Sequence, residues 1–84
     1  MPKIIIYTKE ICPYCNRAKA LLQRKGASFE EIKVTNDEIK EQMIKKANGR
    51  LTVPQIFIDD YHVGGCDDLH ALEAEGKLDK LLQK

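Results

Sequence analysis

The sequence predicts an α/β fold in which a β-α-β unit is followed by a β-hairpin and short C-terminal helices. A run of β-branched residues at 4–6 indicates a buried strand, and apolar residues at helical spacing follow it between residues 13 and 25. Near the C-terminus, two short apolar segments flank a pair of aspartates at 59–60, which is typical of a hairpin. We therefore expect a sheet whose central strand is covered on both faces.

The first strand and the helix after it have the clearest patterns. Residues 4–7 form an uninterrupted run that ends at Tyr7, as expected for a central strand. From Pro13 onward the pattern becomes helical, and Gly26 ends the predicted helix. The apolar residues that repeat at three and four positions are Ala18, Leu21 and Leu22. The chain is thus predicted to pass from a central strand directly into a helix.

A second strand and a second helix follow. Residues 28–34 mix apolar and charged side chains, and a right-handed crossover would place this strand parallel to the first. Thr35 and Glu38 have the spacing of a capping box, so the second helix should begin at Thr35 and end near Asn48-Gly49. This helix leads out of the β-α-β unit.

The C-terminal half begins with a hairpin. Residues 55–58 and 61–63 form its two arms around Asp59-Asp60, and Gly64-Gly65 end it. A short helix that contains Leu69 and Leu72 is broken at Gly76. The last turns can bury three leucines: Leu78, Leu81 and Leu82.

Composition limits the classes of function. A chain of 84 residues is expected to form one domain, and 14 basic against 13 acidic side chains leave a net charge of +1. Without a strong positive field we expect no nucleic-acid partner. The short apolar N-terminus predicts neither a signal peptide nor a membrane anchor. We therefore expect a cytoplasmic protein without a membrane partner. We also expect a monomer, because no feature of the sequence requires a larger assembly.

Two closely spaced cysteines are the most informative motif. The chain has three cysteines, which in a reducing cytosol favour a transient redox or metal site over a disulfide framework. Cys12 and Cys15 lie three residues apart at the start of the first predicted helix. Side chains at this spacing share a helix face, so a tightened first turn would bring the sulfurs within bonding distance. The spacing therefore permits reversible bridging.

The position of each cysteine on the helix predicts different roles. Cys12 lies at or beside the N-cap, where free N–H groups and the helix dipole stabilise a thiolate, so we expect its pKa to be depressed. Cys15 lies nearer the apolar stripe and should be more shielded. Cys12 would attack a substrate disulfide, and Cys15 would resolve the mixed disulfide by forming a Cys12–Cys15 bridge. Pro13 at the first helical position would limit the flexibility of that ring.

A metal site is the alternative that these cysteines leave open. A Cys-x-x-Cys pair is also half of a zinc site, and Cys66 with His62 or His70 would have to complete it. No second Cys-x-x-Cys and no His-x-x-x-His spacing supports such a site, whereas the β-α-β context favours redox chemistry. We therefore predict no metal ligands and assign no role to either histidine.

Four segments carry a resemblance to a known family. They are Tyr7-Thr8-Lys9, Cys12-Pro13-Tyr14-Cys15, Thr52-Val53-Pro54 and Gly64-Gly65-Cys66-Asp67-Asp68-Leu69. Together they resemble the glutaredoxins, in particular the short bacterial dithiol glutaredoxins of the third type. The dithiol motif differs from the Trp-Cys-Gly-Pro-Cys of thioredoxins and from the Cys-Gly-Phe-Ser of iron-sulfur glutaredoxins.

The resemblance implies a fold and an activity. The implied fold is thioredoxin-like, a four-stranded mixed sheet flanked by helices. The implied activity is glutathione-dependent dithiol-disulfide exchange, with Cys12 as nucleophile and Cys15 as resolving thiol. Glutathione would be a co-substrate, with no tightly bound cofactor. Client proteins would carry disulfides or glutathione adducts, and ribonucleotide reductase is one candidate.

The resemblance also implies a glutathione site assembled from separate segments. Pro54 would be a cis-proline, which lets the Val53 backbone pair with the cysteinyl unit of glutathione. Lys9 would face the glycine carboxylate, with Arg50 as a second candidate. The implied glutathione-binding residues are Lys9, Tyr14, Thr52, Val53, Pro54, Gly65, Cys66 and Asp67.

Several of these residues have simpler explanations when the resemblance is set aside. Asp67 would be a helix cap beside backbone N–H groups that suit an anion, and Cys66 would be a buried, inert thiol. The Val53–Pro54 bond would be trans, because only about 5–6% of X-Pro bonds in folded proteins are cis. The alternative functions are a carrier reduced by thioredoxin reductase and a metal- or iron-sulfur-binding module.

Overall fold

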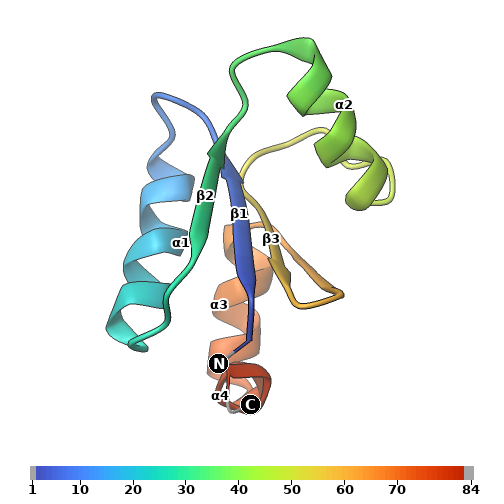
Figure 1. Ribbon diagram of the computed structural model, residues 1–84. Helices are drawn as coiled ribbons and strands as arrows, with labels where there is room; N and C mark the ends of the chain where they lie inside the picture. The colour runs from blue at the N-terminus through green and yellow to red at the C-terminus, as the bar shows by residue number, and fades with distance from the viewer. Residues whose placement is uncertain (1, 83–84) are drawn as a thin grey trace.

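The computed structural model describes residues 2–82, which form a four-stranded mixed sheet with helices on both faces (Figure 1). The elements in chain order are β1 (Ile4–Thr8), α1 (Pro13–Arg24), β2 (Glu30–Lys33), α2 (Asp37–Lys46), β3 (Gln55–Ile58), β4 (Tyr61–Gly64), α3 (Cys66–Ala74) and α4 (Lys77–Leu82). The strand order is β2-β1-β3-β4. β1 pairs with β2 in parallel, whereas β1 with β3 and β3 with β4 are antiparallel. The predicted fold class is confirmed.

β1 is a central strand whose side chains alternate between two cores. Ile4 and Ile6 pack in the larger core with residues of α1, α3 and α4. Ile5 and Tyr7 face the other side, where they meet residues of α2. In Figure 1, α1 and α3 run alongside the sheet and α2 is set apart near the C-terminal end of β1. The prediction of a strand covered on both faces is therefore correct.

The two elements after α1 differ slightly from the prediction. β2 is shorter than the predicted 28–34, because only residues 30–33 have partners on β1 in the parallel register. α2 is capped by Asn36 and not by Thr35: the Asn36 Oδ1 accepts a hydrogen bond from the Ile39 N–H at 2.8 Å. The predicted capping box is wrong by one residue, since Asn36 takes the extended conformation of an N-cap and forms the capping bond itself.

The C-terminal half agrees with the sequence pattern. Asp59 and Asp60 form the hairpin turn, with Asp59 in the left-handed region (φ +53°). Gly76 (φ +73°) separates α3 from α4 as predicted, and Leu78 is fully buried in the larger core. None of the helices within residues 2–82 combines the length and the hydropathy that crossing a membrane requires.

Candidate active site

Cys12 and Cys15 lie at the N-terminus of α1 and are joined by a disulfide, with their Cα atoms 5.2 Å apart. Cys12 is the N-cap residue, in an extended conformation (φ −151°), and Pro13 occupies the first helical position. The strand-to-helix connection of residues 9–11 thus delivers Cys12 to the helix end, as predicted. This Cα separation lies within the usual range for disulfides, so the first turn of α1 accommodates the bridge.

The helix N-terminus presents a hydrogen-bond donor to the Cys12 sulfur. The Cys15 backbone N–H lies 3.1 Å from Cys12 Sγ, in the place that an N-cap side chain normally accepts. In the reduced protein this N–H and the helix dipole would stabilise a thiolate on Cys12. Cys12 is 5% exposed and Cys15 is 1% exposed, so the order is the predicted one although both sulfurs are buried in the disulfide state. The assignment of Cys12 as the attacking thiol and Cys15 as the resolving thiol stays a prediction.

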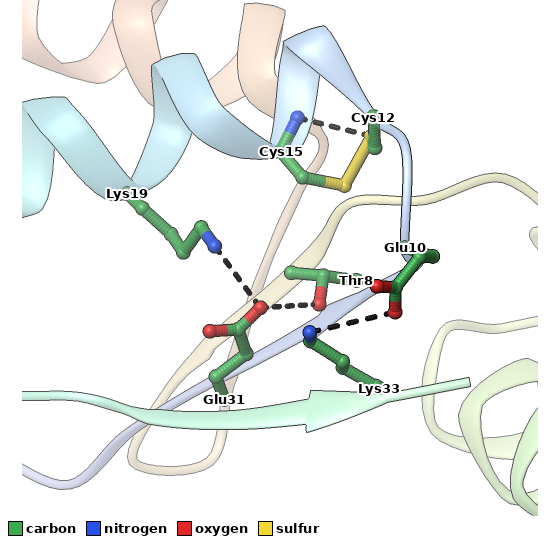
Figure 2. A network of polar contacts seen from close by, with 7 residues as sticks. All are labelled: Thr8, Glu10, Cys12, Cys15, Lys19, Glu31 and Lys33. Atoms are coloured by element: carbon green, nitrogen blue, oxygen red, sulfur yellow. Dashed lines mark hydrogen bonds and ion pairs between the residues drawn. A yellow bond between two sulfur atoms is a disulfide. The ribbon is translucent and has the colours of Figure 1, made fainter. Parts of the chain in front are cut away.

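A polar network beneath the disulfide connects α1 to the sheet (Figure 2). Glu31 Oε2 accepts a hydrogen bond from the hydroxyl of the buried Thr8 at 2.7 Å and pairs with Lys19 Nζ at 3.0 Å. The Thr8 hydroxyl and, next, the Lys19 ammonium hold the pKa of Glu31 below its ordinary value. A charged carboxylate at this place therefore ties the helix that carries the cysteines to β1 and β2.

The loop before β3 lies beside the active site and contains a cis peptide bond at Val53–Pro54. Pro54 is buried, Val53 is partly exposed and Thr52 is exposed. The conformation is the one that the family resemblance implies, and the ordinary trans bond expected from base rates is wrong. The chain enters β3 directly after this proline, at Gln55.

The start of α3 faces this loop, but its cap differs from the one expected. Gly65 is the N-cap, and a carboxylate oxygen of Asp68 accepts the Gly65 N–H at 2.9 Å. Asp67 is exposed in the first turn, so its assignment as the capping residue is wrong. The Gly65 N–H and, next, the Arg50 guanidinium 3.0 Å away keep the pKa of Asp68 low. Arg50 is therefore engaged with Asp68 in this structure.

A cavity of about 350 Å³ opens between these three segments. It is lined by Tyr14, Arg50, Thr52, Val53, Pro54, Gly65, Cys66, Asp67 and Asp68. A Cβ atom built on Gly65 would lie 3.5 Å from the Pro54 carbonyl oxygen, which shows how closely α3 approaches the loop. The structure thus brings together all of the implied glutathione-binding residues except Lys9.

Lys9 lines a second, larger cavity of about 550 Å³ that shares lining residues with the first. Thr52 and Val53 belong to both cavities. The rest of the second cavity comes mainly from the start of α2 and the residues before it. A ligand in the first cavity would therefore have to extend past Thr52 to reach Lys9.

Tyr14 and Cys66 differ in exposure: Tyr14 lies on the surface, whereas Cys66 is buried as predicted. Tyr14 is 56% exposed, and the guanidinium of Arg17 sits 5.7 Å from the centre of its ring. Cys66 is a free, buried cysteine, and its Sγ lies 3.4 Å from His70 Nδ1. Burial, with a smaller effect of the Asp67 carboxylate, raises the pKa of the Cys66 thiol. Within residues 2–82, no three side chains of His, Cys, Asp or Glu are grouped as a metal site.

Two residues near the site were missed by the sequence analysis. Gln55, at the start of β3, is fully buried and donates from Nε2 to Thr52. His62, on β4, completes the contact with its ring Nε2 2.7 Å from Gln55 Oε1. A buried glutamine directly after a proline was the signal available in the sequence, but its partners depend on the hairpin register.

Comparison with known proteins identifies the family. A glutaredoxin family model matches residues 4–63. Glutaredoxin 3 of Escherichia coli K12 is 58% identical over 83 residues, which cover 99% of this chain and 100% of that protein. The chain belongs to the glutaredoxin family. This glutaredoxin is a thiol-disulfide oxidoreductase whose redox pair is Cys12–Cys15.

Solved structures give the same result at the level of the fold. The solution structure of a glutaredoxin from Brucella melitensis superposes with a TM-score of 0.86 at 60% identity, covering 99% of this chain and 90% of that one. A buckwheat glutaredoxin crystallised in complex with glutathione has a TM-score of 0.88 at 32% identity, covering 96% and 76%. The thioredoxin-like arrangement of this glutaredoxin is therefore shared with relatives of widely differing sequence.

Proposed function

We propose that this glutaredoxin uses glutathione to reduce protein disulfides and glutathione mixed disulfides, with Cys12 as the attacking thiol. The main support is the cavity beside α1, whose lining contains every implied glutathione-binding residue except Lys9. The buckwheat relative was crystallised with glutathione, which supports the same ligand class here. Glutathione acts as co-substrate in this scheme.

Glutathione mixed disulfides would be reduced through Cys12 alone. The Cys12 thiolate attacks the glutathione sulfur, so that a Cys12–glutathione disulfide forms and the client leaves as a thiolate that takes up a proton. The thiolate of a second glutathione then attacks the glutathione sulfur of this intermediate. Glutathione disulfide is released and the Cys12 thiolate is restored: the client sulfur is reduced to a thiol, and the sulfur of the second glutathione is oxidised.

Protein disulfides would need both cysteines. Cys12 attacks one client sulfur and forms a mixed disulfide, and Cys15 then attacks the Cys12 sulfur. The client leaves with two thiols, and the enzyme is left with the Cys12–Cys15 disulfide seen in this structure. Two glutathione molecules would return the pair to the dithiol form and leave as glutathione disulfide.

The surroundings of the cavity suit the groups that glutathione carries. Val53 is partly exposed and lines the cavity, so its backbone can pair with an extended tripeptide, and Lys9 can attract the glycine carboxylate. The first turn of α3 offers backbone N–H groups and a helix dipole to the γ-glutamyl carboxylate. The acidic Asp67 would complement the α-amino group of the same unit.

Serine substitutions test the roles of the two thiols. Cys12→Ser should abolish turnover of a glutathionylated peptide, because the thiol at the N-cap is lost and the remaining thiols, Cys15 and Cys66, are buried. Cys15→Ser should retain a measurable part of that activity and lose the reduction of protein disulfides. The assay couples glutathione to glutathione reductase and NADPH consumption. Equal loss in both variants would refute the assignment of Cys12 and Cys15.

The electron donor is tested in the same assay. Wild-type protein should be reduced by glutathione with glutathione reductase much faster than by thioredoxin reductase. The reverse preference would make it a glutaredoxin-like electron carrier that is reduced by thioredoxin reductase.

We also propose the cytoplasm as its compartment, since a glutathione pool there keeps thiols reduced. Its clients would be disulfide-bonded or glutathionylated proteins, with ribonucleotide reductase one candidate.

A further inference from the structure

Gln55 is a fully buried polar side chain whose hydrogen-bonding atoms are all occupied. Its Nε2 donates to the Thr52 carbonyl oxygen at 2.9 Å and lies 3.3 Å from the Thr52 hydroxyl. Its Oε1 lies 2.7 Å from His62 Nε2. Glutamine, threonine and histidine thus form a continuous chain of hydrogen bonds from β4 to the loop that carries the cis-proline.

The direction of every bond in this chain follows from one carbonyl group. A backbone carbonyl only accepts hydrogen bonds, so the end of Gln55 that faces Thr52 must be the amide nitrogen. The opposite end, facing His62, must then be the carbonyl oxygen. Since that oxygen only accepts, His62 must donate, and its ring proton must be on Nε2.

The surroundings of His62 fix its ring in place and favour the neutral form, which has one N–H. Its ring stacks on Phe57, with centroids 4.9 Å apart and planes inclined by 22°. Burial first, and the positive charge of Arg50 second, lower the pKa of His62, while the Asp68 carboxylate opposes them. A neutral ring with one N–H is therefore the form expected at neutral pH.

We infer that His62 and Gln55 are positioning residues that make the Thr52 hydroxyl a hydrogen-bond donor toward glutathione. The Thr52 oxygen accepts from Gln55, so its own proton is free to point away from the protein. Thr52 is exposed and lines both cavities, so this proton meets an oxygen acceptor of the bound tripeptide. The inference depends on the proposed use of glutathione.

Matched substitutions at Thr52 measure the contribution of the hydroxyl. Thr52→Val keeps the shape of the side chain and removes the donor, so the KM for a glutathionylated peptide should rise about two- to tenfold, the range that one neutral hydrogen bond supplies. Thr52→Ser keeps the donor and should raise KM much less than Thr52→Val does. Because the bond is present before and during the reaction, kcat should change little.

We call the hydrogen-bonded chain His62–Gln55–Thr52 the relay. Substitution of Gln55 tests whether this relay acts through Thr52. Gln55→Met is similar in length and lacks both the donor and the acceptor, so it should raise KM in the same direction as Thr52→Val. The double variant should be no worse than the more affected single variant, because both changes remove the same interaction. Full additivity of the two effects would refute the relay.

The proton position on His62 gives a readout that a purely structural role would not predict. Nitrogen NMR of histidine-labelled protein, recorded above the pKa of the ring, should show the His62 proton on Nε2. In Gln55→Met this preference should weaken. A proton on Nδ1 in the wild type would refute the inference, since Gln55 would then have to be reversed against the Thr52 carbonyl.

The outcomes separate this inference from the proposed function. Wild-type protein that is not reduced by glutathione would refute the proposed function and the inference with it. Wild-type protein that is reduced by glutathione, with equal KM values for Thr52→Val and Thr52→Ser, would refute the relay alone. Thr52 is exposed, so both of its variants should fold, and this comparison remains decisive even if Gln55→Met does not fold.

Discussion

Removal of the Asp68 carboxylate should destabilise the protein substantially. Removal of the neighbouring Asp67 carboxylate should not, because Asp67 does not cap α3. Asp68→Ala eliminates the acceptor of the Gly65 N–H at 2.9 Å and the ion pair with Arg50 at 3.0 Å. A hydrogen bond to a charged group is worth about 1.5–3 kcal/mol, and the lower end applies because the Asp68 side chain is 47% exposed. The exposed ion pair adds about 0.2–1 kcal/mol.

The expected loss is therefore about 2 kcal/mol of unfolding free energy, equivalent to a decrease in Tm of about 8–16 °C for a domain of this size. Thermal and urea unfolding of the oxidised protein, followed by circular dichroism, measure it. Arg50→Gln is the first control, because it removes only the ion pair and should cost about 0.5 kcal/mol. Asp67→Ala is the second control, since it removes a neighbouring carboxylate that does not cap the helix.

The same bond predicts a pH dependence with a definite sign. The pKa of Asp68 is lower in the folded protein than the ordinary aspartate value of about 3.9, first because of the Gly65 N–H and then because of Arg50. Its stabilising contribution is therefore complete above about pH 4 and is lost as the pH falls through the folded pKa. The stability difference between wild type and Asp68→Ala should shrink in that range. A constant difference from neutral pH to pH 2.5, or an equal loss in Asp67→Ala, would refute the reasoning.

Three further predictions concern the core, the network beneath the disulfide and the third cysteine. Leu69→Ala, at a fully buried position on α3, should cost about 2–5 kcal/mol in urea unfolding. Glu31→Gln should reduce stability at neutral pH and flatten its loss in acid, because the lowered pKa of Glu31 contributes stability above about pH 4.3 that disappears as the pH falls; a matching acid profile would contradict this. After reduction, iodoacetamide at pH 7 should label Cys12 well before Cys66, whose thiol pKa is raised by burial, and mass spectrometry would show the order.

The patterned parts of the fold could be predicted because their periodicity is independent of tertiary context. The run at residues 4–7 and the apolar stripe of α1 are local signals, and the structure places both as expected. The redox pair followed from the same signals, since a Cys-x-x-Cys that begins a helix has a fixed geometry. The strand predicted at 28–34 was too long at both ends, because only pairing with β1 decides which residues belong to β2.

The helix caps and the cis-proline could not be obtained in this way. Thr35 and Asn36 are both good capping residues, and only the path of the chain determines that Asn36 forms the bond. Asp67 and Asp68 pose the same ambiguity at α3, where the helix begins after Gly65, so that Asp68 accepts the Gly65 N–H and also pairs with Arg50. The isomer of the Val53–Pro54 bond came from the family resemblance alone.

The contact between His62 and Gln55 depends on the register of the β3–β4 hairpin. The two-residue turn at Asp59-Asp60 places Phe57 opposite His62 across the hairpin. Residues 55 and 57 of a strand point to the same face, so His62 stacks on Phe57 and is a diagonal neighbour of Gln55, within reach of a long side chain. A slip of one residue in this register would carry His62 to the other face of the sheet. The polarity of the Thr52 hydroxyl thus depends on the register of a turn at the other end of β3.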